Sequence, residues 1–97
     1  AGGLPSIAVL PFLHAGGKAE DSYLAEGIIE GIIHVLSGLD GLLVISQNST
    51  QGYAGQRIDV RQVGRDLDVG YVLSGSVRRA GERIRIATEL SETETGR

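Results

Sequence analysis

The amino-acid sequence predicts an α/β (α+β) single domain in the order β-α-β-α-β-β, with two helices packed on a mixed sheet and a C-terminal antiparallel hairpin. Short apolar runs alternate with segments whose apolar residues recur at helical spacing, which is the pattern of strand–helix–strand units. The stretch from Tyr71 to Leu90 then alternates with a period of two on both sides of a Gly-containing turn, which indicates a β-hairpin.

Composition limits both the core and the kinds of function. The chain has 97 residues, which is the size of one domain, and its few aromatic residues require a core of Ile, Leu and Val. The absence of Cys excludes a disulfide framework and a thiolate metal site. The net charge of −3, without a dense basic stripe, makes nucleic-acid binding a poor candidate. No apolar run is long enough to span a membrane, and no signal peptide is visible.

The first half of the chain predicts one strand and one helix. Ser6–Phe12 is a compact apolar run typical of a buried strand, and Pro11 should place it near a sheet edge or end it. Residues 14–18 are expected to form a flexible loop. A helix is predicted from about Ser22 to Leu39, capped by Asp21 or Ser22. Its inward stripe comprises Leu24, Ile28, Ile32, Val35, Leu36 and Leu39, widened by Ile29 and Ile33.

The segments that follow predict a second strand and a second helix. Leu42–Ser46 should be a short buried strand, parallel to the first because a helix connects them. Residues 47–56 are interpreted as a loop with Tyr53 packed down. Asp59 is the expected N-cap of a helix over Val60–Leu67, with Val60, Val63 and Leu67 facing inward.

The hairpin is the most informative stretch. Its second strand places Ile84, Ile86, Thr88 and Leu90 on one side and the residues between them on the other, as expected of a half-buried strand. Residues 79–82 form the turn, with Gly81 supplying a positive φ. The polar run Ser91–Arg97 should be a frayed end.

No pattern in the sequence supports catalysis or cofactor binding. Gly16-Gly17-Lys18 lacks the other residues of a phosphate-binding loop, because Phe12 and Ala19 stand where Gly and Ser or Thr are needed. His14 and His34 belong to no metal-binding motif, and no serine has a nucleophile setting. We therefore predict no catalytic, cofactor-binding or metal-ligating residue, no cofactor, and no enzyme activity in this fragment.

Two sets of residues have a structural and a functional interpretation. The hairpin carries the only cluster of charge, formed by Arg78, Arg79, Arg83 and Arg85. A solvated sheet face that protects an edge is the favoured interpretation, and a patch that binds an anion or a protein is the alternative. Gly27 and Gly31 are spaced four apart on the first helix. Close packing of this small-residue face on the sheet is favoured, with a helix-mediated homodimer as the alternative.

Several segments together resemble the TolB-like amino-terminal domains of bacterial class III adenylate/guanylate cyclases with tetratricopeptide repeats and of related multidomain regulators. The matching segments are Pro5–Phe12 (PSIAVLPF), Tyr23–Gly27, Leu43–Ser46, Tyr53–Gly55, Val60–Val69 and, most specifically, Tyr71–Ile86. The sequence departs from the family pattern at Ser74, which stands in place of Glu, and at Gly31 and His34. The loop His14–Lys18 is also shorter and less acidic than usual.

The resemblance implies a non-catalytic regulatory or protein-interaction module. Its expected partners are other domains of the parent protein or a second copy, with no nucleic acid and no membrane insertion. The alternative is a small-molecule or nucleotide sensor that uses the loop His14–Lys18 and the basic hairpin. A cytoplasmic location is expected, or a periplasmic one if a transmembrane helix precedes the domain.

The resemblance also suggests domain limits. Residues 1–4 are interpreted as a linker or cloning remnant, and residues 5–97 as the TolB-like α/β domain. The absent initiator Met indicates an excised piece of a longer protein. The family continues into a further strand after the polar stretch, so we expect the sheet to lack an edge strand or to fill that edge from a neighbour.

Overall fold

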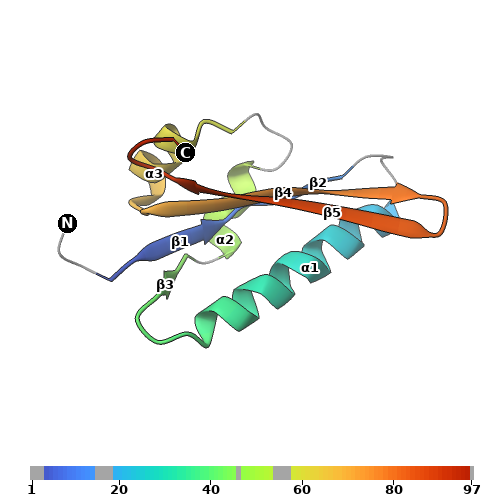
Figure 1. Ribbon diagram of the computed structural model, residues 1–97, viewed down its shortest axis with the longest axis horizontal. Helices are drawn as coiled ribbons and strands as arrows, with labels where there is room; N and C mark the ends of the chain where they lie inside the picture. The colour runs from blue at the N-terminus through green and yellow to red at the C-terminus, as the bar shows by residue number, and fades with distance from the viewer. Residues whose placement is uncertain (1–3, 15–18, 46, 54–57, 97) are drawn as a thin grey trace.

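The computed structural model describes residues 4–14, 19–45, 47–53 and 58–96 (Figure 1). Its elements are β1 (Ser6–Val9), β2 (Leu13–His14), α1 (Ala19–Ser37), β3 (Leu43–Val44), α2 (Gln47–Thr50), the 3-10 helix η1 (Gln51–Tyr53), α3 (Val60–Leu67), β4 (Tyr71–Ala80) and β5 (Arg83–Glu92). The predicted α/β fold with a C-terminal antiparallel hairpin is confirmed. The short elements β2, α2 and η1 were not predicted.

The long strand β4 joins the other strands into one mixed sheet. On one side it pairs in parallel with β1, through Ile7 opposite Tyr71, and further along with β2. On the other side it pairs with β5 in an antiparallel ladder. The strand β3 pairs in parallel with the far side of β1, which confirms the predicted parallel pairing across the first helix.

The predicted strand Ser6–Phe12 is interrupted at Pro11. The strand β1 ends at Val9 and β2 resumes at Leu13, four positions later, whereas their partners Leu73 and Ser76 are three positions apart. The extra residue is accommodated as a bulge, where Pro11 has no N–H to contribute to the ladder. The expectation that the strand stops near Pro11 is confirmed, and its predicted end at Phe12 is wrong.

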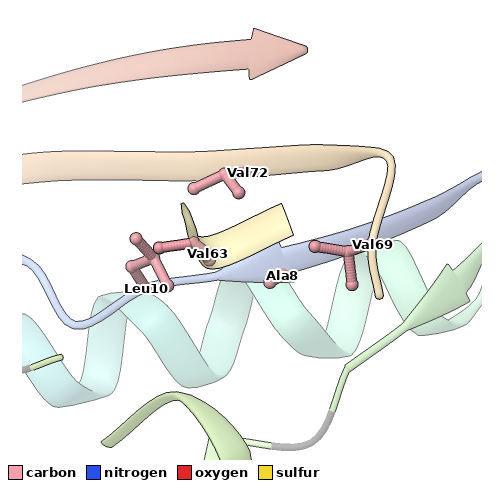
Figure 2. Close-up of a cluster of buried hydrophobic side chains, with 5 residues drawn as sticks. All are labelled: Ala8, Leu10, Val63, Val69 and Val72. Carbon is pink, nitrogen blue, oxygen red and sulfur yellow. The ribbon is translucent and has the colours of Figure 1, made fainter. Parts of the chain in front are cut away.

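Successive residues of β1 contribute to two separate cores on opposite faces of the sheet. The α3-side core contains Ala8, Leu10, Val63, Val69 and Val72. Figure 2 shows Val63 of α3 lying between Leu10 and Val72, with Ala8 and Val69 beside them. The predicted inward positions of α3 and the packing of Tyr53 are confirmed, because these side chains pack against this core.

The α1-side core contains Val9, Phe12, Ala25, Ile29 and Val77. The helix α1 begins at Ala19, so the predicted caps Asp21 and Ser22 are wrong. Its predicted stripe is also partly wrong, because Val35 is 67% exposed and Leu39, 53% exposed, lies beyond the end of the helix at Ser37. At 100° per residue, Val35 lies about 120° around the helix from Ile29, which is outside the face that contacts the sheet.

Two further expectations for the middle of the chain are corrected. The second strand is shorter than predicted, and Leu43 is exposed because β3 has β1 as its single neighbour within the described part of the chain. The predicted loop over residues 47–56 contains α2 and η1 as far as Tyr53, and Thr50, the last residue of α2, is fully buried.

The polar end of the chain is held in place rather than frayed. Ser91 and Thr93 are buried. The Thr93 N–H donates to the Gly70 carbonyl at 3.0 Å, and Thr93 Oγ1 donates to the Val69 carbonyl at 2.7 Å. These bonds tie the end of β5 to the segment that leads into β4, so the prediction of a frayed end is wrong.

Among the described residues, no helix combines the length and the apolar character needed to cross a bilayer.

Candidate functional site

Nine of the ten residues of β5 are exposed, and this strand forms an outer edge of the described sheet (Figure 1). Within the described part of the chain, its one strand neighbour is β4. The helix α1 packs mainly on β2, β3 and β4. Ile84, Ile86 and Leu90 are 44%, 48% and 59% exposed. Both faces of β5 are exposed over residues 83–90, so the prediction of a half-buried strand is wrong.

The backbone of β5 presents alternate residues to the open edge. The Leu10 N–H donates to the Leu73 carbonyl, so Leu73 directs its backbone groups toward β1. The Gly70 carbonyl accepts from the Thr93 N–H, so the even-numbered positions of β4 point toward β5. Backbone groups alternate in direction along an antiparallel pair. On β5 the N–H and C=O groups of Ile84, Ile86, Thr88 and Leu90 consequently point away from β4.

The side chains of the same residues lie on the α1 side of the sheet. Val77 is the register partner of Ile86 and belongs to the α1-side core. Directly opposite residues share a face, and successive residues alternate between faces. Ile84, Ile86, Thr88 and Leu90 therefore form one row beside that core, which we call the Ile–Leu row.

The four arginines of the hairpin do not share one face. Arg78 and Arg85 are register partners and lie directly opposite each other on the α3 side, together with Arg83. Arg79 is the partner of Ile84 and lies on the α1 side. Like charges directly opposite in a sheet are destabilising. Three of the four arginines therefore lie on the α3 side of the hairpin and one lies on the α1 side. Their use as an interaction patch stays a prediction.

Gly27 and Gly31 lie on the exposed side of α1. A Cβ atom added at either position would meet no atom within 4 Å. The favoured prediction that these glycines pack closely on the sheet is therefore wrong, because Ala25 and Ile29 make that contact instead. The alternative, a dimer face, stays a prediction.

An open groove lies where β1 and β4 begin and α3 ends, and it carries both signs of charge. Arg61, Arg65, Asp68, Glu92 and Glu94 contribute to its lining. Two of these side chains already have partners, since Arg61 donates to the Thr95 carbonyl at 3.1 Å and Arg65 donates to Gln62 Oε1 at 2.9 Å. Because positive and negative side chains line the same groove, its charge favours neither an anionic nor a cationic ligand.

A small polar network holds η1 against α3. The Tyr53 hydroxyl donates to Asp66 Oδ2 at 3.0 Å, and Gln62 Nε2 donates to Asp66 Oδ1 at 2.7 Å. Burial raises the pKa of the Tyr53 hydroxyl above its usual value, and the hydrogen bond and negative charge of Asp66 add to this effect. All three side chains have partners within the network, so we assign them a structural role.

Metal or nucleotide binding gains no support from the described residues. Among them, no group of three or more His, Cys, Asp or Glu side chains is arranged to hold a metal ion. His14 and His34 are both exposed and belong to different elements, β2 and α1. Residues 15–18, which the alternative sensor hypothesis requires, lie outside the described residues.

The family described as "HilA/YgeH-like transcriptional regulator, second domain" matches residues 3–96. The chain belongs to this family. It is also 52% identical over 92 residues to "Putative adenylate cyclase 3" of Rhizobium meliloti (strain 1021). That match covers 95% of this chain but 16% of the Rhizobium protein, so the chain corresponds to a small part of that relative.

Solved structures show the same fold at low sequence identity. The lipoprotein GNA1162 of Neisseria meningitidis matches with a TM-score of 0.72 at 17% identity, over 95% of this chain and 72% of that one. TolB of Acinetobacter baumannii matches with a TM-score of 0.66 at 16% identity, over 97% of this chain and 21% of that one. The C-terminal domain of LpoB from Escherichia coli has a TM-score of 0.62 at 17% identity, over 95% and 74% of the two chains. The expected TolB-like fold is confirmed.

Proposed function

We propose that the chain is a non-catalytic regulatory module of a multidomain bacterial signalling protein, with an adenylate cyclase as the effector, and that it acts through protein contacts. The observation that carries the proposal is that one kind of domain occurs in two settings. Its family is described as part of transcriptional regulators, and a close relative is named for cyclase activity. Because the same kind of domain accompanies both a transcriptional regulator and a cyclase, we assign it a regulatory role rather than DNA binding or cyclase catalysis.

The physical support is the open edge of β5. The outward N–H and C=O groups of the Ile–Leu row can bond to an added strand, and such groups are a template for strand addition. Arg83 and Arg85 lie beside this edge on the α3 side and would orient an approaching partner by charge. Exposed apolar side chains on the α1 side add area to the same contact.

The test uses the Rhizobium relative with its matching segment replaced by this chain. The edge variant carries Ile84→Lys and Ile86→Lys, which place charges along β5. The control is Val35→Lys, at an apolar residue of α1 that is more exposed than either. We expect the edge variant to change cyclic AMP production by the whole protein about fivefold or more, which is the usual lower end of allosteric coupling. We expect the control to leave production near the unsubstituted level.

The outcome that contradicts the proposal is equally specific. If neither the edge variant nor complete deletion of the segment changes cyclic AMP production, the chain does not regulate the cyclase. If the isolated chain itself makes cyclic AMP, the module is catalytic and the proposal is wrong.

A further inference from the structure

We infer that the α3-side face of the hairpin is a binding site for a phosphate group, held between the guanidinium groups of Arg78 and Arg85. The site consists of side chains that project from the face of the sheet, so it does not depend on the edge of β5. A further strand beside β5 would lie in the plane of the sheet and would extend this face rather than cover it. The inference goes beyond the proposed function, because its ligand is an anionic group rather than a protein surface.

The register of the hairpin brings two positive charges together. Arg78 of β4 is directly opposite Arg85 of β5. The Gly70 carbonyl accepts from the Thr93 N–H, so even-numbered residues of β4 direct their backbone groups toward β5. Arg78 and Arg85 therefore form a hydrogen-bonded pair of the ladder, with Cα atoms about 5.5 Å apart. Their side chains leave the same face of the sheet as neighbours.

These charges have no neutralising partner nearby. Within the described part of the chain, Arg78, Arg83 and Arg85 form no side-chain hydrogen bond or ion pair. The nearest carboxylate of β5 on this face is Glu89, four residues from Arg85 and about 13 Å along the strand. Glu82 belongs to the turn and not to the ladder. Like charges directly opposite are destabilising, so an anion between the two arginines would relieve their repulsion.

The surrounding side chains leave room for such an anion. Ser76 and Ala87 are opposite each other, one step along the same face from the arginine pair, and both are small. The Ser76 hydroxyl adds a donor beside the pair. Arg83 lies about 7 Å along β5 from Arg85 and adds a third positive charge. Figure 1 shows the turn of the hairpin at the opposite end of the sheet from α3, and all three arginines are exposed.

Two adjacent guanidinium groups favour a phosphate group over a carboxylate. A single guanidinium already matches both oxygens of a carboxylate through a pair of parallel hydrogen bonds. A phosphate group offers three terminal oxygens and carries about two negative charges near neutral pH. It can therefore accept from both arginines and balance both of their charges. Inorganic phosphate and a phosphate monoester share this chemistry.

Titration with inorganic phosphate, followed by NMR at constant ionic strength, tests the site. The backbone signals of Ser76, Arg78, Arg85 and Ala87 should shift and saturate together. Arg78→Gln and Arg85→Gln should each weaken binding about tenfold, because each removes charge-assisted hydrogen bonds to the anion. Arg85→Lys should also weaken it, because an ammonium group keeps the charge and loses the forked geometry. The absence of a saturable shift at these four residues overturns the inference.

Arg79→Gln is the matched control. Arg79 is next to Arg78 in the sequence but lies on the α1 side of the hairpin. The variant removes the same charge from the same strand and should weaken phosphate binding less than about twofold, because salt screens charges at this separation. If it weakens binding as much as Arg78→Gln does, phosphate responds to the total charge and the inference fails. The substituted side chains are exposed, so circular dichroism should show folded chains for every variant.

A second titration distinguishes the sources of the phosphate group. It compares a short phosphoserine peptide with the same peptide carrying serine and with inorganic phosphate. Tighter binding of the phosphoserine peptide than of inorganic phosphate identifies a phosphorylated side chain as the ligand. Binding of inorganic phosphate at least as tightly identifies the free ion or a small ester. If both peptides bind equally well, the face recognises peptide rather than phosphate, and the inference is overturned.

Calorimetry with the Rhizobium relative, carrying this chain in place of its matching segment, tests the site in a whole protein. We expect a component of phosphate binding that Arg78→Gln removes and Arg79→Gln retains. If phosphate binds at this face only in the isolated chain, another part of the relative covers the face and the inference is overturned. The proposed function is decided separately, because its test measures cyclic AMP production.

Discussion

Two kinds of glycine occupy the helices and strands of this domain. At Gly27 and Gly31 an added Cβ would meet nothing within 4 Å. At Gly64 it would come within 2.5 Å of Thr93 Cβ, and at Gly75 within 2.6 Å of the Ala87 carbonyl oxygen. Packing therefore requires only the second kind, and the first kind weakens α1 without a contact that explains it.

Gly27→Ala should stabilise the domain. Gly costs about 0.5–1 kcal/mol relative to Ala inside an exposed helix, and nothing here opposes the new methyl group. The free energy of unfolding in urea at 25 °C should rise by about that amount, and Gly31→Ala should behave in the same way. A loss of stability would show that α1 has a neighbour at this face.

The matched control is Gly64→Ala, which has the same helical propensity gain. Its methyl group would collide with Thr93, whose side chain is buried and held by a hydrogen bond. Overpacking of this kind costs about 1–3 kcal/mol. The two glycine variants should therefore shift the urea midpoint in opposite directions.

Thr93→Val tests the anchoring of the carboxy-terminal segment. The change keeps the shape of the side chain and removes the hydroxyl that donates to the Val69 carbonyl. Loss of a buried hydrogen bond costs about 1–2 kcal/mol. Urea denaturation should show this loss, and hydrogen exchange at the Thr93 amide should accelerate. An unchanged exchange rate would mean that the backbone bond to Gly70 holds the segment alone.

At the scale of the element, α3 shows what local sequence signals can determine. Its predicted bounds, Val60–Leu67, match the structure, and Asp59 is the N-cap. The carboxylate of Asp59 accepts from the N–H groups of Arg61 at 3.1 Å and Gln62 at 3.4 Å. An N-cap residue directly before an amphipathic run of two turns allows few other positions for the start and end of the helix. The prediction therefore succeeds.

Asp59→Ala should destabilise α3 by removing that cap. The expected loss in the free energy of unfolding is about 1 kcal/mol. Asp59→Asn is the control, because an amide oxygen caps nearly as well and its stability should stay close to the wild-type value. If Asn and Ala are equally destabilising, the charge of Asp59 matters rather than its hydrogen bonds.

The helix α1 and the strand β5 show where local signals fail. Many apolar residues surround α1, so periodicity alone does not decide which arc meets the sheet, and Val35 is assigned wrongly. The alternation in β5 correctly predicts that Ile84 and Ile86 share a face. Whether that face is covered depends on where α1 lies, which is a property of the assembled sheet and not of the strand.

At the scale of the whole molecule, the candidate site is only partly readable from sequence. The arginine cluster is visible as composition, but its division between two faces depends on the register that pairs Arg78 with Arg85. Likewise Thr93 is one polar residue among several in the last segment. Its burial follows from the approach of α3 at Gly64, some thirty positions earlier. Long-range contacts of this kind leave no local pattern.

The position of β1 between β3 and β4 has a consequence for biosynthesis. Its neighbour on one side, Tyr71, lies more than sixty residues further along the chain than Ile7. A ribosome releases residues from the amino terminus onward, and contacts of large sequence separation form slowly. The first strand of this domain therefore has to remain unpaired on that side until nearly the whole domain has been synthesised. During this interval its apolar run, Ile7 to Leu10, is a ready binding site for chaperones.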